Sequence, residues 1–159
     1  MSFTINTKIN GKSISASAEA STSLLEFLRD TLEMKGSKLC CNTRECGACT
    51  IIYNGMPINS CVTMAADAIG AEITTIEGLA DGDKLHPVQQ AFIDTGAVQC
   101  GYCTPGLIMS AVGLLLENPN PTEEDVRFGI GGNLCRCTGY AKVVQAILKA
   151  SEAMPAAGA

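Results

Sequence analysis

The sequence predicts an α+β fold in which a β-rich half precedes a helical half. Apolar residues recur with a period of two before about Glu77 and with a helical period after about His86. A segment rich in glycine and aspartate separates the two patterns, and each half carries its own set of four cysteines. Because 159 residues suffice for two small domains, we expect one domain at residues 1–77, a linker at 78–85 and a second domain at 86–159.

Two hairpins dominate the expected β-rich half. The pairs Asn10-Gly11 and Asn54-Gly55 each separate two segments of alternating polarity. An Asn-Gly pair in this context is a strong hairpin signal. The strands expected are Phe3–Ile9, Ser13–Ala18, Thr50–Tyr53, Met56–Asn59 and Glu72–Ile76.

One helix is expected within this half. Ser23 and Glu26 form a capping box, and an apolar run follows that we expect to end at Gly36. Short strands, one helix and a cysteine loop together favour a compact β-grasp arrangement.

Four helices are expected in the second half. Pro87 stands near the first position of one helix, and we place Thr104 as the N-cap and Pro105 as the first residue of the next. The expected helices are His86–Ile93, Thr104–Leu116, Thr122–Phe128 and Tyr140–Glu152, followed by a frayed tail at Met154–Ala159. This pattern predicts a small four-helix bundle.

The first cysteine set is spaced Cys41-x4-Cys46-x2-Cys49-x11-Cys61. This is the spacing of plant-type 2Fe–2S sites, and a zinc site is the alternative. Cys40 makes a ninth thiol where two four-ligand sites need eight. It could replace Cys41 only with a C-x5-C spacing, so we interpret it as a spare thiol packed beside the site.

The second cysteine set consists of a C-x2-C pair and a C-x-C pair separated by thirty-one residues. The pairs are Cys100 with Cys103 and Cys135 with Cys137. Four thiols in two tight pairs are what a metal ion or an iron–sulfur cluster requires. We expect Gly132 and Gly139 to permit the tight backbone around the C-x-C pair. A zinc knot or two disulfides are the alternatives.

The composition argues against several classes of protein. A formal charge of −5 without a Lys/Arg run gives no footprint for nucleic acid, and no glycine-rich nucleotide fingerprint is present. The longest apolar run, Leu107–Leu116, is too short to span a membrane. No secretory pattern marks the N-terminus, so nine cysteines favour metal ligation in the reducing cytoplasm over disulfides.

Three motifs resemble those of one family over nearly the whole chain. They are Glu45–Thr50, Gln99–Gly106 and Gly132–Tyr140, in this order and with full spacing. The chain is thereby similar to the small iron–sulfur subunit of the molybdenum hydroxylases, the xanthine dehydrogenase and aldehyde oxidoreductase family. The resemblance implies a plant-type ferredoxin domain followed by a four-helix iron–sulfur domain, each with one 2Fe–2S cluster.

The resemblance also implies site residues and partners. The ligands would be Cys100, Cys103, Cys135 and Cys137 for the cluster near molybdenum, and Cys41, Cys46, Cys49 and Cys61 for the distal cluster. Gln99 and Cys137 would approach the molybdopterin of a large partner subunit, although Gln99 could instead simply cap its loop. A medium FAD-binding subunit is the expected acceptor in a hetero-oligomer, although a cytochrome or another acceptor is also possible. This chain would then carry electrons within the oxidoreductase, and substrate chemistry would belong to its partner.

The sequence departs from the family where Cys40, Asn42 and Arg44 replace the usual glycines. Asn42 adopts a left-handed backbone readily and Arg44 much less so. We hypothesise that the charge of Arg44 raises the potential of the distal cluster; a solvated surface arginine is the alternative. Two other functions stay open at this point, a free-standing two-cluster carrier and a zinc-stabilised interaction module.

Overall fold

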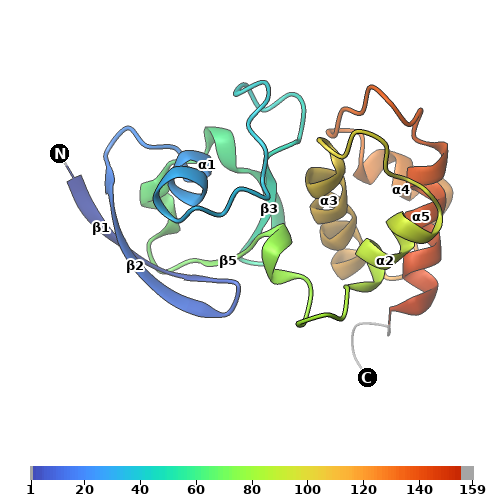
Figure 1. Cartoon of the computed structure of the whole chain (residues 1–159), viewed down its shortest axis with the longest axis horizontal. Helices are drawn as coiled ribbons and strands as arrows, with labels where there is room; N and C mark the ends of the chain where they lie inside the picture. Colours follow the sequence, from blue (N-terminus) through green and yellow to red (C-terminus); the bar gives the residue numbers. More distant parts are fainter. Residues whose placement is uncertain (1, 155–159) are drawn as a thin grey trace.

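The protein has a five-stranded sheet at one end and a group of helices at the other (Figure 1). The computed structural model describes residues 2–154, so the expected frayed tail lies outside the described residues except for Met154. The sheet and the helices each enclose a separate cluster of buried apolar side chains. The mixed α and β content that the sequence predicts is therefore confirmed.

The sheet contains the two predicted hairpins. Its strands are β1 (Ser2–Ile9), β2 (Lys12–Glu19), β3 (Thr50–Tyr53), β4 (Met56–Asn59) and β5 (Glu72–Thr74), in the spatial order β2-β1-β5-β3-β4. Both hairpins are antiparallel, with positive φ at Asn10 and Asn54, as an Asn-Gly turn requires. The last strand, β5, pairs parallel to β1 and antiparallel to β3, and it ends two residues earlier than expected.

The helix of the first half is shorter than the sequence predicts. The capping box is present: the Glu26 amide donates to Ser23 Oγ, and the Ser23 amide donates to Glu26 Oε2. The α-helix α1 (Leu24–Glu26) then widens into a π-helical turn at Phe27–Thr31. The chain leaves the helix through Glu33, whose φ is 57°. The expected end at Gly36 is therefore wrong, and Gly36 instead lies where a Cβ would stand 2.3 Å from a methyl carbon of Ile76.

Four helices follow, as predicted. They are α2 (Pro87–Asp94), α3 (Thr104–Glu117), α4 (Glu123–Gly129) and α5 (Ala141–Ala153). The N-cap of α3 is Cys103 and not Thr104, so the helix begins one residue earlier than expected. Thr104 is its first residue and Pro105 its second. Because proline lacks an N–H, it suits any early position where that group has no helical partner.

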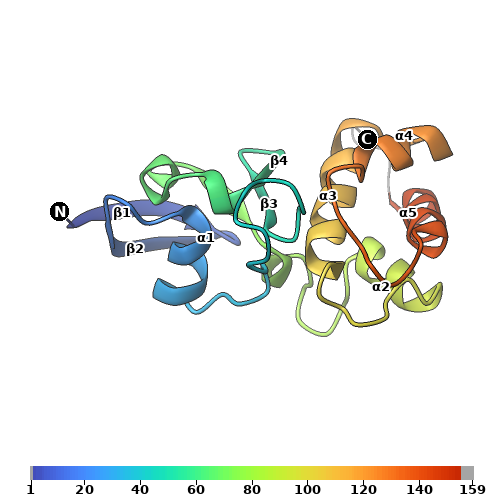
Figure 2. The same ribbon diagram turned by 90° about the horizontal axis from the view of Figure 1, so that it is seen from above.

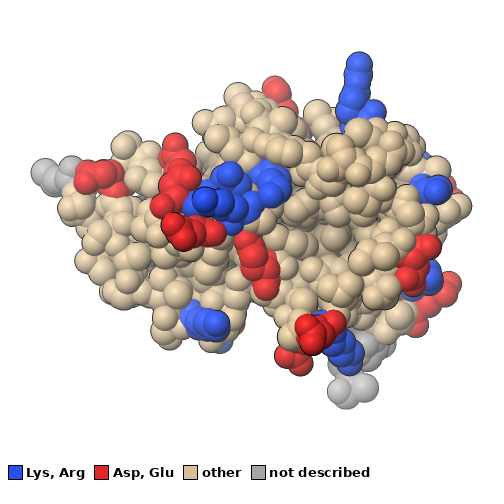
Figure 3. Space-filling model, viewed as in Figure 1, with Lys and Arg blue, Asp and Glu red and all other residues tan. Residues whose placement is uncertain are grey.

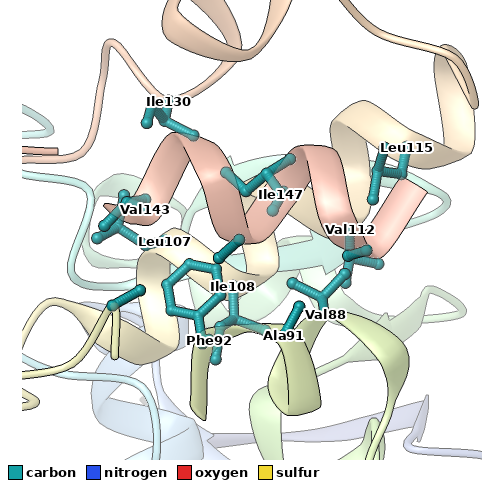
Figure 4. Close-up of a cluster of buried hydrophobic side chains, with 14 of the residues drawn as sticks. Val88, Ala91, Phe92, Leu107, Ile108, Val112, Leu115, Ile130, Val143 and Ile147 are labelled. Carbon is teal, nitrogen blue, oxygen red and sulfur yellow. The ribbon is translucent and has the colours of Figure 1, made fainter. Parts of the chain in front are cut away.

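The helices share one apolar core (Figure 4). Phe92 of α2, Leu107 of α3 and Ile147 of α5 are each at most 1% exposed and belong to it. The amphipathic spacing of α5 places Val143 and Val144 in this core as the sequence predicts. Burial of these apolar surfaces is the main force that holds the helices together.

Helix α3 is the element that joins the helices to the sheet (Figure 2). Ile52 of β3 belongs to the core of the helices rather than to that of the sheet. Gly113 in the middle of α3 faces the ring of Pro57 in β4, and a Cβ there would stand 2.7 Å from Pro57 Cγ. The backbone of α3 therefore lies directly against the sheet.

The surface carries both signs of charge. On the face shown in Figure 3, basic and acidic side chains are interspersed over a mostly uncharged surface. In the part of the chain that the structure describes, each helix is too short or too polar to cross a bilayer.

Candidate metal centres

The loops that contain the cysteines lie on one side of the molecule, at its upper edge in Figure 1. The first set comes from the loop before β3 and from the short 3-10 turn Ser60–Val62 after β4. The second set comes from the loop that leads into α3 and from the loop between α4 and α5. The fold thus brings together thiols that are far apart in sequence.

The first set lies in a loop with unusual backbone geometry. Asn42 and Arg44 have φ values of 58° and 68°, so both occupy the left-handed region that favours glycine. This conformation turns amides of the loop inward, and the N–H groups of Thr43 and Cys46 each donate to Cys41 Sγ at 3.4 Å. Backbone N–H donors around a thiolate stabilise its negative charge.

The thiols of the first set interact electrostatically. The amides of Thr43 and Cys46 lower the pKa of Cys41 to about 6, so this thiol ionises readily. Burial, together with the neighbouring Cys49 and Cys41, raises the pKa of Cys61 to about 11. Burial also raises the pKa of Cys46. A metal centre would supply the positive charge that favours the thiolate form of these groups.

The second set lines a cavity of about 400 Å³. Cys103 and Cys135 are half-buried, whereas Cys100 and Cys137 are exposed. Gly139 has the positive φ that the sequence analysis expected beside the C-x-C pair, but Gly132 does not.

Charge interactions also connect the thiols of the second set. Burial raises the pKa of Cys103 to about 12, and the nearby Cys135 adds to the shift. Burial alone would raise the pKa of Cys135 too, but the hydroxyl and amide of Thr138 offset it and lower the value to about 7. The Thr138 hydroxyl donates to Cys135 Sγ at 3.1 Å. The side chain of Cys100 raises the pKa of Cys137.

The two sets are in direct contact through the loops that carry them. The amide of Leu134, next to Cys135, donates to the carbonyl oxygen of Cys46 at 2.9 Å. The side chain of Asn133 donates to the carbonyl oxygen of Gly47 at 3.0 Å. A covalent path interrupted by one hydrogen bond therefore leads from a thiol of the first set to a thiol of the second.

The remaining candidate residues occupy different positions. Cys40, which the sequence analysis interprets as a spare thiol, is exposed and lines the cavity of the second set. Gln99 is exposed at the entrance to the loop of Cys100. His86 is the N-cap of α2, and its Nδ1 accepts from the Val88 amide at 3.3 Å, as its position in the sequence predicts.

The donor chemistry fits an iron–sulfur cluster in each set. A 2Fe–2S cluster distributes four thiolate ligands over two irons. Each set offers four thiols, with at least one whose pKa is lowered toward the thiolate form.

Sequence reasoning assigned no role to several residues that shape the site. Asn133 is buried, and its amide connects the two loops. The Tyr140 hydroxyl accepts from the Cys135 amide at 2.7 Å and donates to the carbonyl oxygen of Asn133 at 3.2 Å. Both residues lie inside the motif Gly132–Tyr140, but local periodicity contains no signal for contacts of this kind.

Comparison with known proteins agrees with this geometry. Residues 75–148 match the family model of the 2Fe-2S binding domain. The chain is 46% identical to the nicotinate dehydrogenase small FeS subunit of Eubacterium barkeri, over 94% of this chain and 96% of the relative. It is 45% identical to the nicotine 6-hydroxylase small subunit of Paenarthrobacter nicotinovorans, over 92% of this chain and 88% of the relative.

Solved structures give the same result. The fold matches a chain of quinoline 2-oxidoreductase from Pseudomonas putida 86 with a TM-score of 0.93 and 41% identity, covering 96% of this chain and 95% of that chain. It also matches aldehyde oxidoreductase from Desulfovibrio gigas with a TM-score of 0.90 and 41% identity. There it covers 94% of this chain but 17% of the other, so the corresponding region is one part of a longer polypeptide.

The fold, the two sets of cysteines and the similarity to known proteins together define an iron–sulfur protein that transfers electrons. The chain belongs to the family of small iron–sulfur subunits of the molybdenum hydroxylases. It is an electron-transfer subunit of an oxidoreductase complex, as the resemblance of its motifs predicted.

Proposed function

We propose that each cysteine set holds one 2Fe–2S cluster and that the two clusters carry electrons across this chain. When bound, each cluster accepts and releases one electron at a time, so a two-electron oxidation can be discharged in separate steps. The proposed ligands are Cys41, Cys46, Cys49 and Cys61 for the first cluster, and Cys100, Cys103, Cys135 and Cys137 for the second. The observation that carries the proposal is the contact between the two loops through the hydrogen bond from Leu134 to Cys46.

The proposal includes the domain layout. Residues 1–77 would form a plant-type ferredoxin β-grasp domain, residues 78–85 a linker, and residues 86–159 a four-helix iron–sulfur domain. The separate apolar clusters of the sheet and of the helices support this division. The first cysteine set would then belong to one domain and the second set to the other. The contact between the two loops would be a contact between the domains.

The proposed partners follow from the exposed side of the second set. Cys100, Cys137 and Gln99 are exposed, and this is the side on which a large subunit would present its molybdopterin. Electrons would enter through the second set and leave through the first. The exposed loop from Asn42 to Glu45 would face an acceptor, for which we propose the FAD of a medium subunit. The assembly would then be a hetero-oligomer.

The nine free thiols also bear on the cellular compartment in which the complex acts. Thiolate ligands persist in a reducing compartment and form disulfides in an oxidising one. With nine cysteines and none of them paired within the described residues, we propose that the complex acts in the cytoplasm.

The metal content of the complex, purified from its native host, tests the function. We expect about four irons per copy of this chain, together with about one molybdenum. Four irons with no molybdenum in an intact, homogeneous preparation would favour a free-standing carrier. Zinc in place of iron would contradict both functions.

Two matched cysteine variants test the ligand assignment. Cys61→Ser removes a proposed ligand of the first cluster and should abolish the signal of that cluster, reducing iron by about two per chain. Cys40→Ser removes the ninth thiol and should leave the iron content unchanged. Iron content and electron paramagnetic resonance (EPR) after reduction measure both effects. Loss of iron in Cys40→Ser with retention in Cys61→Ser would overturn the assignment.

A further inference from the structure

Asn133 is a polar side chain held inside the contact between the two cysteine loops. It is 4% exposed and stands two residues before Cys135. Its Nδ2 donates to the carbonyl oxygen of Gly47 at 3.0 Å and lies 3.4 Å from Thr50 Oγ1. Asn133 thus reaches from the second loop to the residue that directly follows Cys46 in the first loop.

The contact is close and built from consecutive residues on both sides. Leu134 donates to Cys46 through its backbone, while Asn133 donates to Gly47 through its side chain. A Cβ on Gly47 would stand 2.4 Å from the carbonyl oxygen of Gly132 and 2.5 Å from Asn133 Nδ2. The glycine therefore allows an approach that another residue would prevent.

Tyr140 makes the second loop rigid on the far side of Asn133. Its hydroxyl bridges the carbonyl oxygen of Asn133 and the amide of Cys135. Asn133 and Cys135 are therefore held by one phenol group. A displacement of the Asn133 side chain relative to Gly47 is transmitted to the backbone that carries Cys135.

We propose that Asn133 is a positioning residue that fixes the two cysteine loops relative to each other, and thereby sets the coupling between the clusters they hold. This inference rests on the proposed function. The side chain donates to Gly47 and Thr50 of the first loop, so its role is to fix the separation and orientation of the two loops. Electron transfer and magnetic interaction between two centres both depend steeply on separation, so a small shift of the loops is measurable.

A role in stability alone makes a different prediction. The carbonyl oxygen of Gly47 also accepts from the Thr50 hydroxyl at 2.7 Å and from the Thr50 amide at 3.1 Å. Removing the Asn133 amide therefore leaves this carbonyl with two donors, which limits the desolvation cost of the change. Asn133→Leu keeps the branched shape of the side chain and removes its donors. It should fold and bind iron, but its loops should be less firmly joined.

The test uses the reduced complex. In the wild type we expect about four irons per chain, two EPR signals and a splitting that reports their magnetic interaction. In Asn133→Leu we expect both signals and the full iron content, with the splitting reduced or broadened and electron exchange between the clusters slowed severalfold. An unchanged splitting with unchanged exchange in this variant overturns the inference.

Thr7→Val is the matched control. It also removes a buried side-chain hydrogen bond to a backbone carbonyl, that of Ala71 at 3.0 Å, but this bond lies in the sheet and outside both cysteine loops. Its splitting should equal that of the wild type, and an equal loss in both variants would also overturn the inference. If Asn133→Leu binds less iron, Asn133→Ser replaces it, since the space it leaves admits a water that can satisfy Gly47. The EPR splitting and the rate of electron exchange in Asn133→Ser then test the inference in the same way. A wild-type complex without two cluster signals would instead overturn the proposed function.

Discussion

At the scale of single residues, the first cysteine loop shows two side chains in a backbone conformation that favours glycine. Asparagine is one of the residues that adopt this conformation readily, whereas for Arg44 the left-handed backbone costs about 1 kcal/mol. The backbone amide of Arg44 lowers the pKa of Cys61, which burial otherwise raises, so this residue faces the thiol set through its main chain. Its side chain points into solvent, where it adds positive charge near the loop.

The charge of Arg44 gives a testable consequence. Arg44→Gly should lower the reduction potential of the first cluster, because a positive charge favours the more negative reduced state. The shift should shrink as ionic strength rises, since the side chain is exposed. Redox titration followed by EPR measures it. Arg44→Ala removes the charge but keeps a Cβ on the left-handed backbone, so it should lower the potential by about as much as Arg44→Gly. A shift in Arg44→Gly alone would show that backbone strain, and not charge, determines the potential.

At the scale of elements, the N-terminus of α2 depends on an uncharged histidine. His86 Nδ1 accepts from the Val88 amide, and the His86 amide donates to Gln89 Oε1 at 3.0 Å. Burial lowers the pKa of His86 below its ordinary value of 6.5. Protonation would remove the acceptor and place a positive charge at a helix N-terminus, where it is unfavourable.

The sign of the resulting pH dependence follows from the direction of this shift. The unfolded chain binds the proton more tightly than the folded chain, so stability from His86 is complete above about pH 6.5 and falls as pH decreases through the folded pKa. His86→Asn keeps a capping acceptor that does not titrate. The difference in melting temperature between wild type and variant should therefore change between about pH 7.5 and pH 5. A constant difference would show that His86 does not titrate in this range.

The elements differ in how far the sequence determines them. Asn10 and Asn54 fix their hairpins through local backbone preference, so both turns were predictable. The end of α1 was not predictable from the sequence. Gly36 does not end the helix; it allows a close contact with Ile76, a residue far along the chain. The parallel pairing of β1 with β5 has the same long-range character.

The candidate site shows the same division. Cysteine spacing predicts which thiols belong together, because ligand spacing within a loop is a local property. The hydrogen bond between Leu134 and Cys46 and the contact of Asn133 with Gly47 join residues more than eighty positions apart. No periodicity in the sequence carries this information, so the adjacency of the two sets came from the structure alone.

At the scale of the whole molecule, the position of one cysteine set relative to the other depends on how α3 lies against the sheet. Close contacts occur at two levels of this helix. Near its N-terminus, a Cβ on Gly106 would stand 2.2 Å from the carbonyl oxygen of Gly47. In its middle, Gly113 meets Pro57 of β4. Two glycines on one helix thus allow its backbone to approach both the first cysteine loop and the sheet.

The contact of Gly113 with Pro57 yields the last prediction. Within an isolated helix, glycine to alanine stabilises by about 0.5–1 kcal/mol. Here the added Cβ would stand 2.7 to 3.0 Å from three carbons of a rigid ring, so overpacking should reverse the sign and destabilise by about 1–3 kcal/mol. Thermal unfolding of the full chain measures this effect. Gly132→Ala is the control, because its Cβ would meet nothing within 4 Å. Equal melting temperatures for the two variants would show that α3 can move away from the sheet at little cost.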